Sequence, residues 1–88
     1  NLAKGDLTWA NLSETNAMKA NLVGADLTSA DIKWANFAQA NLSGANLTGA
    51  DLSYTTLFKA NLSGAEWAGA RFCKTTMPDG TINNAGCY

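Results

Sequence analysis

The sequence predicts an all-β solenoid, and three observations lead to that prediction. A five-residue pattern runs without interruption from Asn1 to Thr75. Its second residue is apolar, its fifth is nearly always alanine, and its first is mostly asparagine or aspartate. Apolar residues five apart drift about 140° per step around a helix and form no stripe, and an odd period would swap the faces of a simple strand. Each pentapeptide is therefore expected to form one side of a solenoid and to turn a corner.

Length and charge narrow the possible partners. The chain has 88 residues, with six lysines and arginines against seven aspartates and glutamates, for a net charge of -1. This balance gives no excess of positive charge for binding phosphates, so no nucleic-acid partner is expected. There is no apolar run long enough for a transmembrane helix, so no membrane insertion is expected. The chain begins at Asn1 already in register, and we expect an upstream capping or targeting segment.

The recurring unit of alanine, asparagine or aspartate, leucine and two further residues is seen clearly at residues 40–44 and 60–64. This unit resembles the pentapeptide-repeat family, and the resemblance covers residues 1–75. It implies a right-handed quadrilateral β-helix with four pentapeptides per coil, hence roughly four coils. Residues 1–75 would form the β-helix, and residues 76–88 a short irregular C-terminal cap of the same domain.

A coil of four pentapeptides sorts the residues into columns twenty apart. We number the faces by their first residues: face one begins at 1, 21, 41 and 61, face two at 6, 26, 46 and 66, face three at 11, 31, 51 and 71, and face four at 16, 36, 56 and 76. The second residue of each pentapeptide is expected inside, as at Phe37 on face four. Trp67, Phe72 and Met77 are expected to plug the C-terminal end, and Ile82 to extend the inner column of face one.

The outer columns carry most of the polar residues. An asparagine column on face one is expected to hydrogen-bond from coil to coil through its amides (Asn1, Asn21, Asn41 and Asn61). On face three Trp34 lies over Tyr54, which predicts a stacked aromatic pair with Lys74 at one end. Asp31 and Asp51 stack as like charges in the same face, and Arg71 is placed to relieve their repulsion.

The two cysteines both belong to the C-terminal end. Cys73 and Cys87 flank the turn signature of residues 78–80, and a disulfide between them would close a loop of about 15 residues and stabilise the fold by roughly 3 kcal/mol. Free thiols or half of a shared metal site are the alternatives. The absence of histidine and of a C-x-x-C spacing speaks against the metal. A disulfide would require an oxidising compartment.

The closing segment, residues 71–80 followed by Gly86 and Cys87, is similar to that of pentapeptide-repeat proteins of cyanobacteria and of the plant thylakoid lumen. This similarity implies export to the periplasm or to the thylakoid lumen.

No set of residues predicts catalysis. Without histidine, neither a Ser-His-Asp nor a Cys-His arrangement can be built. The paired carboxylates of Asp31 and Asp51 would lie on a convex rod with no cleft to desolvate a substrate. We therefore expect no enzyme activity, no cofactor and no metal.

Five bulky outward residues form the candidate interaction surface: Trp9, Met18, Trp34, Tyr54 and Phe58. Exposed aromatic residues are enriched at interfaces, which favours a docking strip for a protein partner or for a second rod. The alternative is that they pack between coils, or beneath an N-terminal segment.

These observations predict a non-catalytic structural or protein-interaction module with an unknown protein partner. We expect a monomer, or weak end-to-end or side-to-side association. Some members of the family that this chain resembles are DNA-mimicking inhibitors of type II topoisomerases. The near-neutral charge speaks against that role here. Ice binding through Thr8, Thr28 and Thr48 is a remote alternative, because that array is only one residue wide.

Overall fold

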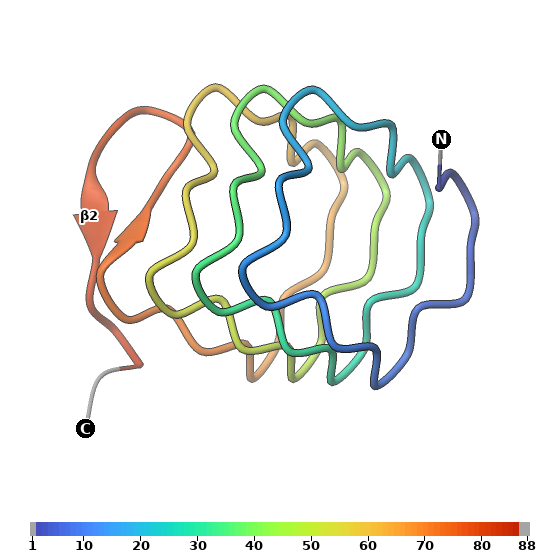
Figure 1. Cartoon of the computed structure of the whole chain (residues 1–88), viewed down its shortest axis with the longest axis horizontal. Helices are drawn as coiled ribbons and strands as arrows, with labels where there is room; N and C mark the ends of the chain where they lie inside the picture. The colour runs from blue at the N-terminus through green and yellow to red at the C-terminus, as the bar shows by residue number, and fades with distance from the viewer. Residues whose placement is uncertain (1, 87–88) are drawn as a thin grey trace.

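The computed structural model describes residues 2–86 and shows a chain wound into stacked coils (Figure 1). Parallel bridges join residues that lie one coil apart, as in the series Asp6 to Asp26, Asp26 to Asn46 and Asn46 to Glu66. Every bridge outside the two named strands has this spacing of 20 residues, which is four pentapeptides. The columns predicted from that spacing are therefore present.

Each pentapeptide up to residue 70 contains a tight turn. The fifth residue donates its N–H to the carbonyl of the second, as from Ala25 to Leu22 at 3.0 Å. The fourth residue has a positive φ, for example +67° at Gly24 and +60° at Trp9. A positive φ at the third of four turn residues is typical of a type II turn, a position that favours glycine because it lacks Cβ. The turn provides the corner that the period of five requires.

Three backbone hydrogen bonds per pentapeptide hold neighbouring coils together. Leu22 donates to the carbonyl of Asn41 at 2.8 Å, and Gly24 donates to Ser43 at 2.9 Å. In the other direction Asn41 donates to the carbonyl of Ala20 at 2.9 Å. Because this pattern repeats on all four faces, the backbone satisfies itself between coils without long strands.

The expectation that asparagine amides bond from coil to coil is wrong. The side-chain Oδ1 of Asn21 accepts the N–H of Val23 at 3.1 Å, two residues later in the same pentapeptide. Asn41 and Asn61 bond Ser43 and Ser63 in the same way. These are Asx turns, in which a short side chain reaches its own backbone two residues on. Asparagine and aspartate therefore shape the start of each turn, while backbone groups join the coils.

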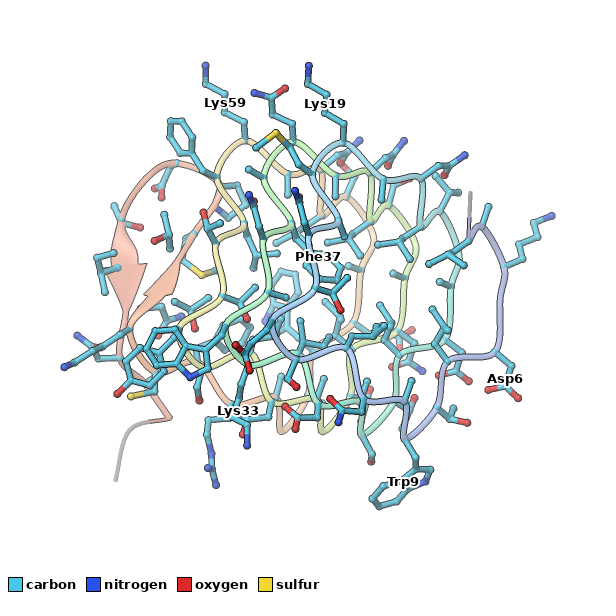
Figure 2. The ribbon with its side chains drawn as sticks, viewed as in Figure 1. Asp6, Trp9, Lys19, Lys33, Phe37 and Lys59 are labelled. Carbon is cyan, nitrogen blue, oxygen red and sulfur yellow. The ribbon has the colours of Figure 1, made fainter. Side chains whose placement is uncertain are left out.

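The core is a narrow column of side chains inside the second and third coils. Its buried members are the second and fifth residues of the pentapeptides, with Phe37 the largest of them (Figure 2). Two buried threonines, Thr55 and Thr75, replace alanine on face three, and their hydroxyls donate to the carbonyls of Ile32 and Leu52. Polar side chains inside the coil are thus paired.

The chain reverses direction at its C-terminal end. Strand β1 (Thr75–Thr76) pairs in antiparallel fashion with β2 (Ile82–Asn83), and Thr76 faces Ile82. Gly86 then donates its N–H to the carbonyl of Phe72 at 2.8 Å. The prediction that Ile82 extends the inner column of face one is wrong, because the reversed chain runs back along face three and leaves Ile82 56% exposed.

The hairpin covers only part of the last coil. Phe72 is buried and Met77 packs against the core, as expected for a plug. Trp67 lies edge-on to Phe72 with ring centroids 6.5 Å apart, but it remains 43% exposed, so it does not close the end as predicted. The reason is that faces one and two of the fourth coil have no chain above them within residues 2–86.

Candidate interaction surface

Face three carries a stacked aromatic pair. The rings of Trp34 and Tyr54 are 4.2 Å apart between centroids and only 3° from parallel. The ammonium of Lys74 lies 5.9 Å from the Tyr54 centroid, at the C-terminal end of the stack. The predicted stack with a terminal cation is confirmed. Trp34 is still 61% exposed, so the pair stands out from the surface.

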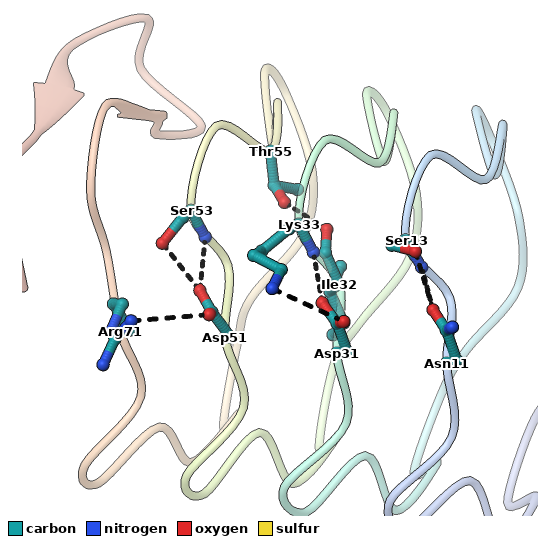
Figure 3. A network of polar contacts seen from close by, with 9 residues as sticks. All are labelled: Asn11, Ser13, Asp31, Ile32, Lys33, Asp51, Ser53, Thr55 and Arg71. Atoms are coloured by element: carbon teal, nitrogen blue, oxygen red, sulfur yellow. Dashed lines mark hydrogen bonds and ion pairs between the residues drawn. The ribbon is translucent and has the colours of Figure 1, made fainter.

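Two ion pairs lie on the same face as this stack, and Figure 3 shows both of them. Arg71 lies 3.7 Å from Asp51, which confirms the predicted relief of the aspartate column, and Lys33 lies 3.7 Å from Asp31. The sequence analysis missed the second pair, although the two residues are only two positions apart. Both pairs are partly exposed, so each contributes less than about 1 kcal/mol to stability. Face three as a whole is formally neutral, with Glu14, Asp31 and Asp51 against Lys33, Arg71 and Lys74.

A shallow pocket of about 310 Å³ opens beside the stack. Lys33, Asp51, Tyr54 and Arg71 line it, together with Ser53, Cys73 and Gly86. The Ser53 hydroxyl is buried and donates to Asp51 Oδ1 at 2.6 Å, so it is held as part of the turn. The Asp51 carboxylate that accepts this bond also lies 3.7 Å from Arg71, so the hydroxyl belongs to a turn and its ion pair.

Face four brings together another two of the five candidate residues. Met18 and Phe58 are both exposed and lie in one column, with Ala38 on the coil between them. The Lys59 ammonium lies 5.4 Å from the Phe58 ring centroid. Trp9 is separate from both groups: it projects from face two and is 80% exposed. The five residues therefore form two local groups and one isolated ring.

The fourth position of the pentapeptide distinguishes the faces. On faces one and two it is glycine in five pentapeptides: Gly24, Gly44, Gly64, Gly49 and Gly69. On faces three and four, the positions with positive φ keep side chains through the first three coils: Glu14, Trp34, Tyr54, Lys19, Gln39 and Lys59. Holding an L residue in this conformation costs about 1 kcal/mol relative to an unstrained one, and such strain is often kept at functional sites. Sequence reasoning missed this signal, which the recurring fourth-position glycines could have revealed.

Hydroxyl groups beside the carboxylates lower the pKa of two aspartates. The Thr8 hydroxyl donates to Asp6 Oδ1 at 2.8 Å, and this bond, with that from the Thr8 amide, holds the pKa of Asp6 below its ordinary value. At Asp79 the Thr81 hydroxyl, at 2.6 Å, is the leading cause of the same lowering of the pKa. Hydrogen bonds to the charged form stabilise it, as both cases show.

These bonds predict a pH effect. A carboxyl whose pKa is lower in the folded state adds stability above its unfolded pKa, and that stability is lost as the pH falls through the folded pKa. For Asp79 the window therefore lies at and below its ordinary value of 3.8. We expect Thr81→Val, which removes the hydroxyl, to raise the Asp79 pKa toward that value. Carboxyl titration by NMR would measure it, and Asp6 should not move; an unchanged Asp79 would contradict the assignment.

Residues 2–86 give little support for an ice-binding threonine column, a metal site or a membrane-spanning helix. The hydroxyls of Thr8, Thr28 and Thr48 bond to the Oδ1 atoms of their own pentapeptides, so the threonine column is engaged within its turns. Within that range no three metal-binding side chains of the histidine, cysteine, aspartate or glutamate type come together. In the same part of the chain there is no helix of the length and apolarity needed to cross a membrane.

Only one of the two cysteines of the predicted disulfide lies within the described residues. Cys73 follows the buried Phe72 on face three, whereas Cys87 lies outside the described residues. The pairing of the two sulfurs therefore stays a prediction.

The chain is similar to known proteins of one family. The pentapeptide repeats family, with eight copies of its unit, matches residues 6–44 and 28–64. A search of curated proteins finds no match. Among solved structures, the pentapeptide repeat protein Rfr23 from the cyanobacterium Cyanothece 51142 is 35% identical, with a TM-score of 0.64 over 76% of this chain and 49% of that one. The chain thus spans about half the length of Rfr23.

Two further structures are similar in sequence. A pentapeptide repeat protein from Nostoc Pcc 7120 is 34% identical over 77% of this chain and 60% of that one, with a TM-score of 0.47. One from the Arabidopsis thaliana thylakoid lumen is 27% identical over 94% of this chain and 68% of that one, with a TM-score of 0.42. The family match, the Rfr23 structure and the parallel bridges all agree: this chain belongs to the pentapeptide repeat family.

Proposed function

We propose that this protein is a non-catalytic module that binds another protein through side chains on faces three and four. The observation that carries the proposal is the contrast at the fourth position of the pentapeptide. Glycine occupies five of the eight fourth positions on faces one and two, where the others are Lys4, Trp9 and Ser29, whereas faces three and four have no glycine there in the first three coils. Keeping Trp34 and Tyr54 in this conformation costs about as much as their stacking returns, so the fold itself gains little from the two rings, and a benefit in binding supports their presence.

The Trp34–Tyr54 stack is the centre of this binding face. Both rings are exposed and held parallel, so little side-chain freedom remains to be lost when a partner binds. Aromatic residues of this kind dominate the energetics of protein interfaces. The ion pairs of Lys33 and Arg71 beside the stack would form a polar rim.

Trp34→Gly tests the proposal without unfolding the protein. The change relieves the positive φ of 65°, which offsets the lost stacking of about 0.5–1.5 kcal/mol, so stability should stay within about 1 kcal/mol of wild type. Affinity capture from an extract of the source cells, followed by rebinding of the captured protein in purified form, should then show loss of binding. Trp9→Gly, on face two, is the matched control. A partner retained equally by both variants would overturn the role of the stack.

We also propose the family's right-handed quadrilateral β-helix for residues 1–75 and a disulfide between Cys73 and Cys87. The described neighbours of the two cysteines support the pairing. Gly86 donates to Phe72, and Lys74 donates to Asn84 Oδ1 at 2.9 Å, so the segments that lead to the two sulfurs lie side by side. Intact-protein mass before and after reduction would show the bond, and an unchanged mass would exclude it.

A disulfide in this position supports an exported protein, in the periplasm or the thylakoid lumen, because thiols stay reduced in the cytosol. Fractionation of source cells with an antibody against the chain tests this location. Recovery only in the cytosolic fraction would contradict it.

A further inference from the structure

The net charge of -1 hides a separation of charge between opposite faces. Face two carries Asp6, Asp26 and Glu66 and no lysine or arginine. Face four carries Lys19 and Lys59. Its one acidic residue, Asp79, sits at the C-terminal end and accepts two hydrogen bonds from Thr81. The charges of face three balance one another and face one carries only Lys4, so face four is the face on which two lysines stand with no acidic residue in the first three coils.

The two lysines of face four project together. Figure 2 shows Lys19 and Lys59 extending from the same side of the rod, away from Lys33 and Trp9. Neither has an ion pair within residues 2–86, whereas Lys33 and Arg71 on face three do. Lys59 lies over the Phe58 ring, but an exposed cation that no carboxylate pairs is available for an anion from outside.

Apolar side chains lie directly beside these cations. Met18 precedes Lys19 and Phe58 precedes Lys59, and all four side chains are exposed. Ala38 and Gln39 occupy the coil between them, so the strip is continuous along the rod. We call these six residues the basic strip. It combines a line of cationic and amide groups with a parallel line of apolar ones.

The backbone conformation at the three polar side chains of the strip would favour glycine. Lys19, Gln39 and Lys59 have φ of 62°, 61° and 61°, whereas Gly24, Gly44 and Gly64 stand at the same position on the adjoining face one. Gln39 also shows that an uncharged side chain of similar length is accommodated in this conformation. Gln39 therefore serves as a model, in the same column, for replacing Lys19 or Lys59 by glutamine.

We propose that the basic strip binds an extended acidic peptide segment that also carries apolar side chains, as part of the protein partner. The inference rests on the proposed function and specifies the chemistry of one face. Lys19 and Lys59 are two coils apart, about 10 Å at the spacing of neighbouring strands. Carboxylates three residues apart in an extended peptide of polyproline II conformation lie on one side of it at a similar separation, because that conformation has three residues per turn and a rise of about 3.1 Å per residue. Apolar residues between them would lie against Met18 and Phe58.

The probe is a soluble fluorescein-labelled peptide with glutamate at every third position, each glutamate being followed by leucine or phenylalanine and then by serine. Its matched control replaces glutamate with glutamine. Binding is measured by fluorescence anisotropy at low and at high salt. We expect the glutamate peptide to bind, the glutamine peptide to bind at least about tenfold more weakly, and the difference to shrink at high salt.

Two variants identify the face. Lys19→Gln with Lys59→Gln should weaken binding about tenfold. Lys4→Glu lowers the net charge by the same two units on face one, outside the basic strip, and should leave binding unchanged. Equal loss in both variants would reduce the effect to net charge, and no binding of the glutamate peptide to wild type would overturn the proposal.

Vesicles provide the competing outcome. Sedimentation with phosphatidylcholine vesicles containing phosphatidylserine should leave the protein in the supernatant. Binding to these vesicles that is lost in the Lys19, Lys59 variant, with none to the peptide, would assign the strip to a membrane surface and overturn the proposal. Partner capture that depends on Trp34 would remain a separate result, so failure of the basic strip and failure of the interaction module can be told apart.

Discussion

Phe37→Ala is expected to lower the free energy of unfolding by about 3–5 kcal/mol, the usual loss for a large buried aromatic side chain. Phe37 is 2% exposed and is the largest fully buried side chain of the core. The coil is closed by backbone hydrogen bonds on every side, so it cannot collapse easily into the cavity that alanine would leave. Domains of this size are stable by roughly 5–15 kcal/mol, so the loss would be a large fraction of the total.

Urea unfolding followed by circular dichroism would measure this change. Phe58→Ala is a matched control because it removes the same side chain from the outside of the same face, where we expect a loss below about 1 kcal/mol. Similar losses at the two positions would contradict the assignment of inside and outside along this column.

Gly86→Ala is expected to detach the C-terminal hairpin from the last coil. A Cβ at this glycine would lie 2.9 Å from the backbone nitrogen of Phe72 and 3.1 Å from the Cα of Arg71. Because these neighbours are backbone atoms, the hairpin itself has to move, and the hydrogen bond from Gly86 to Phe72 is lost with it. We expect a loss of about 1–3 kcal/mol, within the range for overpacked sites.

Hydrogen exchange would locate the effect. The amides of Lys74 and Gly86 should exchange faster in Gly86→Ala, while those of the second and third coils, such as Leu42, should be less affected. Gly69→Ala is the control, since a Cβ there meets nothing within 4 Å and only the strain of its φ of +69° is added. Equal acceleration throughout the chain would mean that the hairpin and the coils open as one unit.

Most of the repeating part of the fold follows from the sequence. The period of five and the twenty-residue coil place Phe37 inside and Trp34 over Tyr54, as the structure has them. This works because each position repeats in a fixed environment, so a single residue type reports on its whole column. The Arg71 to Asp51 contact could be predicted for the same reason.

The parts that the sequence did not predict correctly depend on local backbone geometry. Asn21 was expected to hydrogen-bond to the next coil, but its Oδ1 accepts the N–H of Val23, which is only two residues away in the sequence. Nothing in the period of five distinguishes these two partners. Ile82 lies beyond the last complete repeat, where the turn around Gly80 reverses the chain and the column rule no longer applies. A column argument holds only while the chain keeps winding in one direction.

The candidate surface shows the same division. The sequence predicts its exposed aromatic residues, and the twenty-residue columns already place Trp9 on face two, apart from the other four. The strained fourth position was not predicted, because it requires a backbone dihedral angle.

The bridges between residues twenty positions apart also limit how such a chain can change in length. Removing residues 21–40 would take out one whole coil and leave every remaining residue on its original face. Removing five residues would move each later pentapeptide to the neighbouring face, so Lys59 would no longer share a side with Lys19. Genetic duplication or loss can therefore preserve a surface pattern of this protein only in units of one complete coil.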